Sequence, residues 1–223
     1  MFTPCDTSED CLFQIKQCDT YIELLEDNLL KGHNSLIKQA TVNEIRQTNA
    51  IQKQHYQEYK VLLEKEAEEA KWAARAVQYP EATYIWLYMR NNFGWSETIC
   101  AGIMGNMMAE VAGGTLQYLS RWDMDEPGGL GLIQWIGERR VDIRAKYGYI
   151  PTIDEQLDFM KDELYGSNGV CKQVTDSQLL AIFEASTPER VAYNFARYFE
   201  RCASFSYGIR KQYARIAYNY FVD

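Results

Sequence analysis

Apolar side chains recur at helical spacing along most of the chain, beginning with two long segments. From Leu12 to Gly32 the apolar positions alternate in steps of three and four, which predicts a helix that ends at the glycine. This first stripe consists of Ile15, Cys18, Ile22, Leu25 and Leu29.

The second segment, from Thr41 to Tyr79, keeps the same spacing with several polar interruptions. Two interpretations are open: an antiparallel helical hairpin packed on the rest of the chain, or a coiled-coil-like arm that oligomerises or contacts a partner. The length of the segment, unusual for a globular helix, slightly favours the arm. Its stripe comprises Val42, Ile45, Asn49, Gln52, Tyr56, Tyr59, Leu63, Glu66, Ala70, Ala73 and Val77.

Pro80 marks a change in character, because proline cannot continue a helix without cost and aromatic residues become frequent beyond it. We therefore predict an N-terminal arm at 1–80 and a second domain at 81–223. Period-two alternation is absent except for a short candidate hairpin within 115–135, so the fold is predicted to be mainly α with a small loop or hairpin region. Helices are expected over 81–92, 96–110, 137–147, 152–165, 175–183, 187–199 and beyond Ser206.

One predicted helix carries a carboxylate on its apolar stripe. Ile99, Ile103 and Met107 recur at intervals of four, and Glu110 follows on the same face. A carboxylate among apolar neighbours is badly solvated when charged, so it should hold its proton more tightly, as a general acid must near neutral pH. Gly105 precedes this glutamate, and its expected use is the close approach of another segment.

An acidic loop follows this helix and supplies candidates for a second carboxylate. Two carboxylates in different environments can take different catalytic roles. Each acidic residue of this loop could equally belong to a solvated turn before Pro127. The candidates are Asp123, Asp125 and Glu126.

Composition excludes several functions. The net charge of −8 is spread without a basic patch, which argues against nucleic-acid binding, and no apolar run is long enough to span a membrane. Residues 1–13 lack a basic start and an apolar stretch, so no signal peptide is predicted. The six cysteines form no CxxC pair and are expected to be reduced thiols, and a zinc site on Cys11 and Cys18 is disfavoured because no matching pair follows.

The positions of the histidines narrow the chemistry further. The two histidines, His33 and His55, both precede residue 80. Residues 80–223 therefore cannot form a histidine-ligated zinc peptidase or a Ser–His or Cys–His nucleophile pair, and they contain no glycine-rich phosphate loop. Carboxylates remain, which points towards glycoside cleavage; neither a metal nor a cofactor is expected.

Each candidate residue has a structural alternative. Glu110 could be a structural carboxylate paired with an arginine such as Arg139. Gln134 could fix a sugar substituent or simply cap a turn. Three aromatic side chains could stack on sugar rings or belong to the core: Tyr118, Trp122 and Trp135.

At these residues the sequence resembles the phage tail lysozyme family, whose members cleave peptidoglycan. The resemblance covers about 81–220, and more distantly extends to goose-type lysozymes and lytic transglycosylases. One departure is Val111, where family members commonly have serine. The matching segments are 84–88, 101–107 with Glu110, 131–135, Arg139-Arg140, Gln156-Leu157 and Phe199-Glu200-Arg201.

The resemblance implies a lysozyme-like fold in which Glu110 is the general acid and Gln134 lies in the cleft. It implies peptidoglycan as substrate, a place in the phage tail and action at the cell wall. The expected absence of a signal peptide and the expected reduced cysteines fit assembly in the bacterial cytoplasm. The arm at 1–80 would then bind other tail proteins. Three alternatives stay open: a lytic transglycosylase, a non-catalytic tail protein that kept the fold, and an endopeptidase, which the missing histidines disfavour.

Overall fold

The computed structural model describes residues 4–31, 35–111, 115–119, 128–148 and 151–222. Most of this backbone is helical and none of it forms a named strand, which confirms the prediction of a mainly α fold. The chain divides into two compact units, the N-terminal unit (1–73) and the C-terminal unit (74–223). None of the described helices combines the length and apolar character that crossing a bilayer requires.

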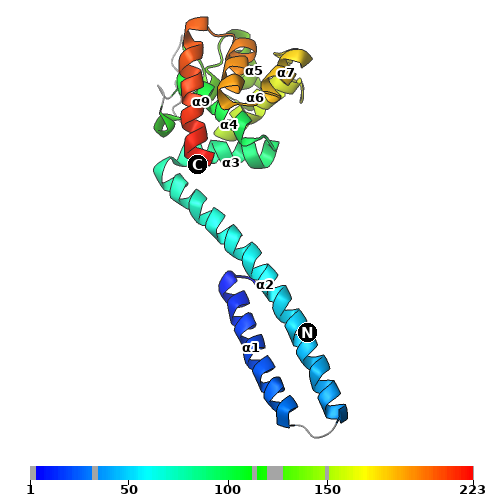
Figure 1. The fold of residues 1–223 in the computed structure, drawn as a ribbon. Helices are drawn as coiled ribbons and strands as arrows, with labels where there is room; N and C mark the ends of the chain where they lie inside the picture. The colour runs from blue at the N-terminus through cyan, green and yellow to red at the C-terminus, as the bar shows by residue number, and fades with distance from the viewer. Residues whose placement is uncertain (1–3, 32–34, 112–114, 120–127, 149–150, 223) are drawn as a thin grey trace. The chain divides into compact units, whose positions relative to one another are not determined.

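Two helices build the N-terminal unit: α1 (Ser8–Lys31) and α2 (Ser35–Gln78), the latter continuing past the boundary between the units. They lie side by side and antiparallel (Figure 1), since Ser8 near the start of α1 bonds to Glu66 far along α2. Nearer their other ends, Tyr21 donates to Glu44. The antiparallel pairing is therefore established.

The inward face of α1 agrees with the predicted stripe, and that of α2 agrees only in part, since Val42, Ile45 and Tyr59 are half-buried as predicted. Thr48 and His55 are buried, with 9% and 2% of their surface exposed. The predicted positions Tyr56 and Leu63 are instead 48% and 46% exposed. The face was misplaced by about one residue because the side chains that α2 buries are polar, and a pattern of apolar residues does not register them.

Seven helices of the C-terminal unit lie where the sequence predicted them. Between them come short 3-10 turns at Leu116–Tyr118, Gly131–Ile133 and Ser204–Ser206, and a π-helix at Ala196–Glu200. In place of the candidate hairpin, the described residues contain an isolated bridge between Leu130 and Trp135. The helices are α3 (Pro80–Phe93), α4 (Glu97–Glu110), α5 (Gly137–Tyr147), α6 (Ile153–Tyr165), α7 (Asp176–Phe183), α8 (Pro188–Phe195) and α9 (Tyr207–Val222).

Polar caps begin four of these helices. Ser96 and Thr187 each accept a hydrogen bond from the backbone three residues on. Thr152 and Thr175 form complete capping boxes with Glu155 and Gln178. Such caps satisfy backbone donors that a helix start leaves unpaired, which is why the sequence located these boundaries well.

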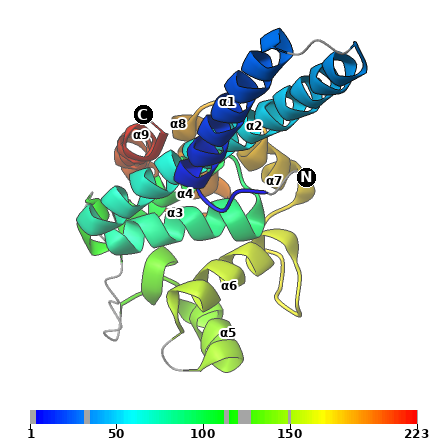
Figure 2. The ribbon, with the colours of Figure 1, turned by 90° about the horizontal axis from the view of Figure 1, so that it is seen from below.

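Helix α4 is the centre of the C-terminal unit, and every residue from Ile99 to Met108 is buried. It packs against α8 and α9, with α3 on another side (Figure 2). A Cβ on Gly105 would lie 2.5 Å from the backbone nitrogen of Ala214 in α9, and one on Gly102 would lie 2.4 Å from Val191 in α8. The expected use of Gly105, the close approach of another segment, is confirmed.

Candidate active site

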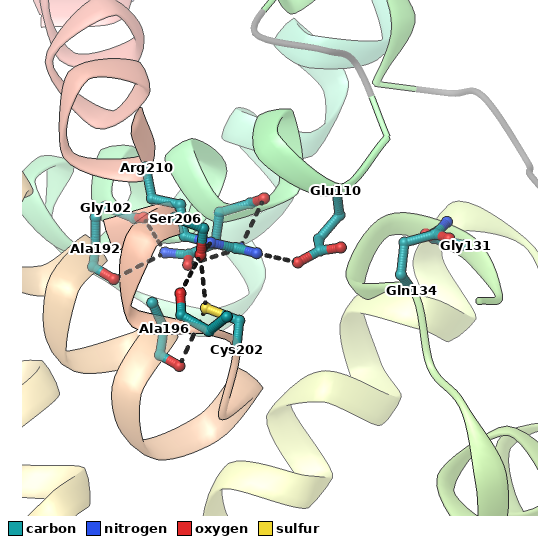
Figure 3. Close-up of polar contacts among 11 residues, drawn as sticks. Gly102, Glu110, Gly131, Gln134, Ala192, Ala196, Cys202, Ser206 and Arg210 are labelled. Atoms are coloured by element: carbon teal, nitrogen blue, oxygen red, sulfur yellow. Dashed lines mark hydrogen bonds and ion pairs between the residues drawn. The ribbon is translucent and has the colours of Figure 1, made fainter. Parts of the chain in front are cut away.

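Glu110 is the last residue of α4, with 21% of its side chain exposed. Its Oε1 pairs with Nη2 of Arg210, which projects from α9 (Figure 3). The sequence named Arg139 as an example of a structural partner, but Arg139 pairs elsewhere. The expectation of a carboxyl surrounded by apolar groups is also corrected, because the fold brings a buried guanidinium to it. Val111 ends the helix with its side chain buried.

Asn106 holds this arginine in place from one helical turn earlier. Its Nδ2 donates to the carbonyls of Gly102 and Ala192, at 3.0 and 3.2 Å. Its Oδ1 accepts from Nη1 of Arg210 at 3.1 Å. Asn106 and Glu110, four residues apart on α4, thus both bind the guanidinium of Arg210. This explains why an asparagine and a glutamate occur at this spacing in the helix.

Arg210 is 4% exposed, and Ser206 accepts a further bond from its Nε at 3.4 Å. Burial opposes its charge, but the hydrogen bond and the negative charge of Glu110 raise the pKa of Arg210 above its usual value. The guanidinium therefore stays charged and is the counter-ion of Glu110 in this structure.

A second arginine–carboxylate pair involves Arg139 and Glu163. Nε and Nη2 of Arg139 donate to the two oxygens of Glu163 at 2.6 and 2.7 Å. The indole of Trp135 donates to the same carboxylate at 2.8 Å, and the guanidinium lies 4.6 Å from the ring centre of Phe199. This bidentate geometry belongs to a structural ion pair that joins α5 to α6.

Glu200 ends the π-helix and is the carboxyl that sequence reasoning missed. Its Oε1 is shut away from solvent and has no hydrogen-bond partner among the described residues. Burial and then the negative charge of Glu110 raise the pKa of Glu200 to about 8, although Arg139 and Arg210 act in the opposite direction. Glu200 is therefore protonated near neutral pH. Only its place in the Phe199-Glu200-Arg201 segment pointed to it, and a π-helix, frequent at functional sites, has no simple sequence pattern.

The Gly131–Ile133 turn packs near α4 and is fixed by Gln156. Gly131 has a φ of 67°, and a Cβ there would lie 2.1 Å from Oε1 of Gln156. That oxygen accepts from the backbone of Leu132 at 2.8 Å, and Nε2 of Gln156 donates to Pro151 at 3.0 Å. The missing side chain at Gly131 thus leaves the space that the amide group of Gln156 occupies.

Gln134 and Trp135 follow this turn. Gln134 donates from Nε2 to the carbonyl of Gly131 at 2.9 Å, which favours its turn-capping alternative. Figure 3 shows it on a segment facing the one that carries Glu110. Trp135 is 1% exposed, packs on Phe159 and uses its indole N–H internally, so its ring is not available to stack on a sugar. The expectation of Trp135 as a substrate platform is therefore corrected to a core role.

The remaining predicted site residues lie wholly or partly outside the described residues. Tyr118 falls in the 3-10 turn at Leu116–Tyr118, with its side chain outside the described part of the structure. The other four lie outside the described residues altogether: Trp122, Asp123, Asp125 and Glu126.

A separate pocket of about 650 Å³ is lined by Trp95, Lys161 and Tyr165, among others. Neither Glu110 nor Gln134 lines it. We do not assign this pocket to the carboxylate chemistry, because its walls contribute none of the groups at that site.

The fold and the site together define a class: a lysozyme-like helical domain in which a buried central helix presents a glutamate at its end. The family model described as phage tail lysozyme matches residues 80–221. The chain therefore belongs to the phage tail lysozyme family, and a lysozyme-like function on peptidoglycan follows at the level of the family. No curated protein matches the chain.

Proposed function

We propose that this protein hydrolyses the glycosidic bonds of peptidoglycan with Glu110 as general acid. The observation that carries the proposal is the placement of Glu110. It ends a helix that is buried from Ile99 to Met108, it pairs with Arg210, which Asn106 also binds, and it keeps part of its side chain open to solvent. A rigidly held carboxyl with one accessible side suits proton transfer to a bound substrate.

The second argument is the contrast between Glu110 and Glu200. Glu110 is ion-paired to Arg210, whereas Oε1 of Glu200 is shut away from solvent without a hydrogen-bond partner among the described residues, and the raised pKa of Glu200 keeps it protonated near neutral pH. Environments that separate two carboxyls in this way are typical of acid–base sites. In our proposal Glu200 stays protonated, so it adds no second negative charge next to Glu110. The bound sugar separates Glu110 from Arg210, Glu110 then takes up a proton from solvent, and it passes this proton to the leaving oxygen.

A loop carboxylate completes the proposed mechanism. Asp123, Asp125 or Glu126 would stabilise the oxocarbenium character of the sugar or activate water. The distance between this group and Glu110 would then decide between retention and inversion. Without a second carboxylate in reach, an internal sugar hydroxyl would close an anhydro ring, as in a lytic transglycosylase. Gln134, Trp122 and Tyr118 remain the proposed substrate contacts.

Product analysis tests this proposal. Purified peptidoglycan is digested with the full-length protein, and the soluble fragments are identified by mass spectrometry. Fragments with reducing ends are expected from a hydrolase, and anhydro ends would assign a transglycosylase instead. If walls of several chemotypes yield no fragments, the protein is a non-catalytic tail component.

We also propose that the protein is made in the bacterial cytoplasm, joins the phage tail through 1–80 and acts at the cell wall during infection. The family description supports the tail, and exposed apolar side chains on α1 support a protein partner. Phe13 and Leu24 are 59% and 55% exposed and line one shallow apolar surface. Clusters of this kind often mark interaction sites.

This assignment predicts a separation of activities. Replacing Phe13 and Leu24 together by serine should leave fragment release unchanged and reduce incorporation into particles at least tenfold. Val61→Ser, at an exposed apolar position of α2, is the matched control. Normal incorporation of the double variant would contradict a role for this surface in assembly.

A further inference from the structure

The N-terminal unit contains a cluster of metal-ligating side chains that the proposed hydrolysis does not use. Ligand atoms of Cys5, Cys11, His55 and Glu58 all lie within 4.8 Å of one another. In the part of the chain that the structure describes, this is the group with the composition and spacing to hold a metal ion. Cys11 and His55 are buried, at 0% and 2% exposure.

Three segments bring these groups together. His55 and Glu58 are three residues apart on α2 and so share one face. Cys11 lies in the first turns of α1, and Cys5 precedes that helix. The backbone N–H of Cys5 donates to Oε2 of Glu58 at 3.2 Å, which fixes the segment before α1 against α2.

Two distances between donor atoms on different segments of the chain are near those of tetrahedral coordination, and the two sulfurs, bonded to each other in this structure, would have to separate on reduction. Sγ of Cys5 lies 3.4 Å from Nδ1 of His55, and Sγ of Cys11 lies 3.9 Å from Oε2 of Glu58. Zinc–ligand bonds of about 2.0–2.3 Å place neighbouring donors of a tetrahedron about 3.3–3.8 Å apart. Two thiolates, an imidazole and a carboxylate are ligands that zinc accepts.

We propose that Cys5, Cys11, His55 and Glu58 form a structural zinc site that joins the start of α1 to the middle of α2. His55 coordinates through Nδ1, the nitrogen that faces Cys5. This differs from the expectation of no metal, and the zinc site disfavoured from the sequence was a different one, on Cys11 and Cys18, for which no matching pair follows. The fold supplies the missing ligands from α2, some fifty residues away in sequence.

The N-terminal unit buries few apolar side chains, so a bound metal ion would add to its stability. Among its described residues, the buried apolar side chains are Cys11 and Leu25, and Ser8, Thr48 and His55 supply the rest of the buried set. So few buried apolar groups contribute little to the stability of a helix pair. A zinc ion bound only by the folded form adds its binding free energy to folding.

A disulfide is the alternative state of the same sulfurs. The structure joins Cys5 and Cys11 by a disulfide, with their Cα atoms 5.4 Å apart, which corrects the expectation that these two are free thiols. The other described cysteines are free. A dithiol reductant transfers two electrons and two protons to this bond, giving two thiols and its own disulfide. Zinc binding then releases the two thiol protons to solvent. Reduced thiols are the rule in a cytoplasm, where zinc can reach them.

The test uses the full-length protein, reduced, loaded with zinc and desalted under anaerobic conditions. Elemental analysis should find about one zinc per chain in the wild type, and none in Cys11→Ser or His55→Gln. Cys18→Ser is the matched control, because Cys18 is a partly buried cysteine of α1 outside the cluster, and it should bind zinc normally. Metal retained by Cys11→Ser, or lost equally from Cys18→Ser, would overturn the proposal.

A measurement on the wild type alone keeps the test decisive if the variants misfold. Cobalt replaces zinc, and the reduced protein should show the intense visible absorption of tetrahedral cobalt with thiolate ligands. Zinc should also raise the thermal midpoint of the N-terminal unit. The weak spectrum of octahedral cobalt, or no zinc in the reduced wild type, would refute the site. Neither result depends on peptidoglycan cleavage, so this inference and the proposed function fail separately.

Discussion

The two units of this protein are stabilised in different ways. In the C-terminal unit, α4 is buried along ten successive residues and glycines let neighbouring helices approach it closely. In the N-terminal unit, two long helices meet through polar contacts such as Ser8 with Glu66, and they bury few apolar groups. The first arrangement gives the rigidity that a catalytic carboxyl needs. The second leaves apolar side chains such as Phe13 and Leu24 exposed, which we propose bind a partner, and buries too few apolar groups to stabilise the helix pair strongly.

The largest expected effect on stability comes from Arg210. Arg210→Met should lower the free energy of unfolding of the C-terminal unit by about 3–5 kcal/mol, because Glu110 and Asn106 lose the charge that satisfies them. Urea denaturation followed by tryptophan fluorescence measures this. A loss below 1 kcal/mol would mean that the pair contributes little to the fold.

The next largest effect on stability is expected at the close contact between α4 and α9. Gly105→Ala should cost about 1–3 kcal/mol or more, because the added methyl meets the backbone of Ala214, which cannot rotate away. Gly208→Ala is the control, since that position in α9 faces open space. Because Gly208 is the second residue of α9, where helix propensity counts for less than in a helix interior, the control should change stability by no more than about 0.5 kcal/mol. Equal effects at both positions would contradict the packing described for α4.

The pH dependence of stability tests Glu200. Its pKa of about 8 in the folded protein lies above the ordinary value of about 4.3, so the folded state binds more protons than the unfolded state between these values. The contribution of this carboxyl to stability is therefore complete below about pH 4 and is lost as the pH rises to 8. Glu200→Gln should be less sensitive to pH than the wild type across this window, in denaturation series at pH 5, 7 and 9. Exposed Glu184→Gln should keep the wild-type slope, and an unchanged slope in Glu200→Gln would refute the assignment.

The smallest effect is expected in the N-terminal unit. Leu63→Ala should change stability by no more than about 0.5 kcal/mol, because that side chain is 46% exposed on α2. Met104→Ala in α4, where the side chain is fully buried, should cost about 2–5 kcal/mol. Hydrogen exchange measures the stability of each unit separately. Comparable losses of stability in the two variants would contradict the difference in packing between the units.

These differences also explain how far the sequence could predict the structure. The helices of the C-terminal unit were predictable because caps such as Ser96 and Thr152 carry local signals. The partner of Glu110 was not, because Arg210 lies a hundred residues away and only the packing of α9 on α4 brings it there. The inward face of α2 was misplaced because it buries polar groups, of which His55 is one.

The site, like the fold, was predictable only where local sequence signals exist. Glu110 and the Gly131–Gln134 segment could be singled out from motif and chemistry, whereas their neighbours depend on tertiary structure. Glu200 was overlooked because it ends a π-helix, which has no simple sequence pattern, and because the enclosure of its Oε1 depends on tertiary packing. Trp135 was interpreted as a platform because sequence alone does not separate a core indole from an exposed one.

The rate of fragment release by Glu110→Gln tests the central claim most directly. The variant, the wild type and Glu184→Gln are compared on the same peptidoglycan, at a temperature where thermal melts show all three folded. The account predicts that Glu110→Gln releases soluble fragments about 10²–10⁴ times more slowly, with Glu184→Gln at the wild-type rate. Release by Glu110→Gln at the wild-type rate would show that another group is the acid and would contradict the proposed mechanism.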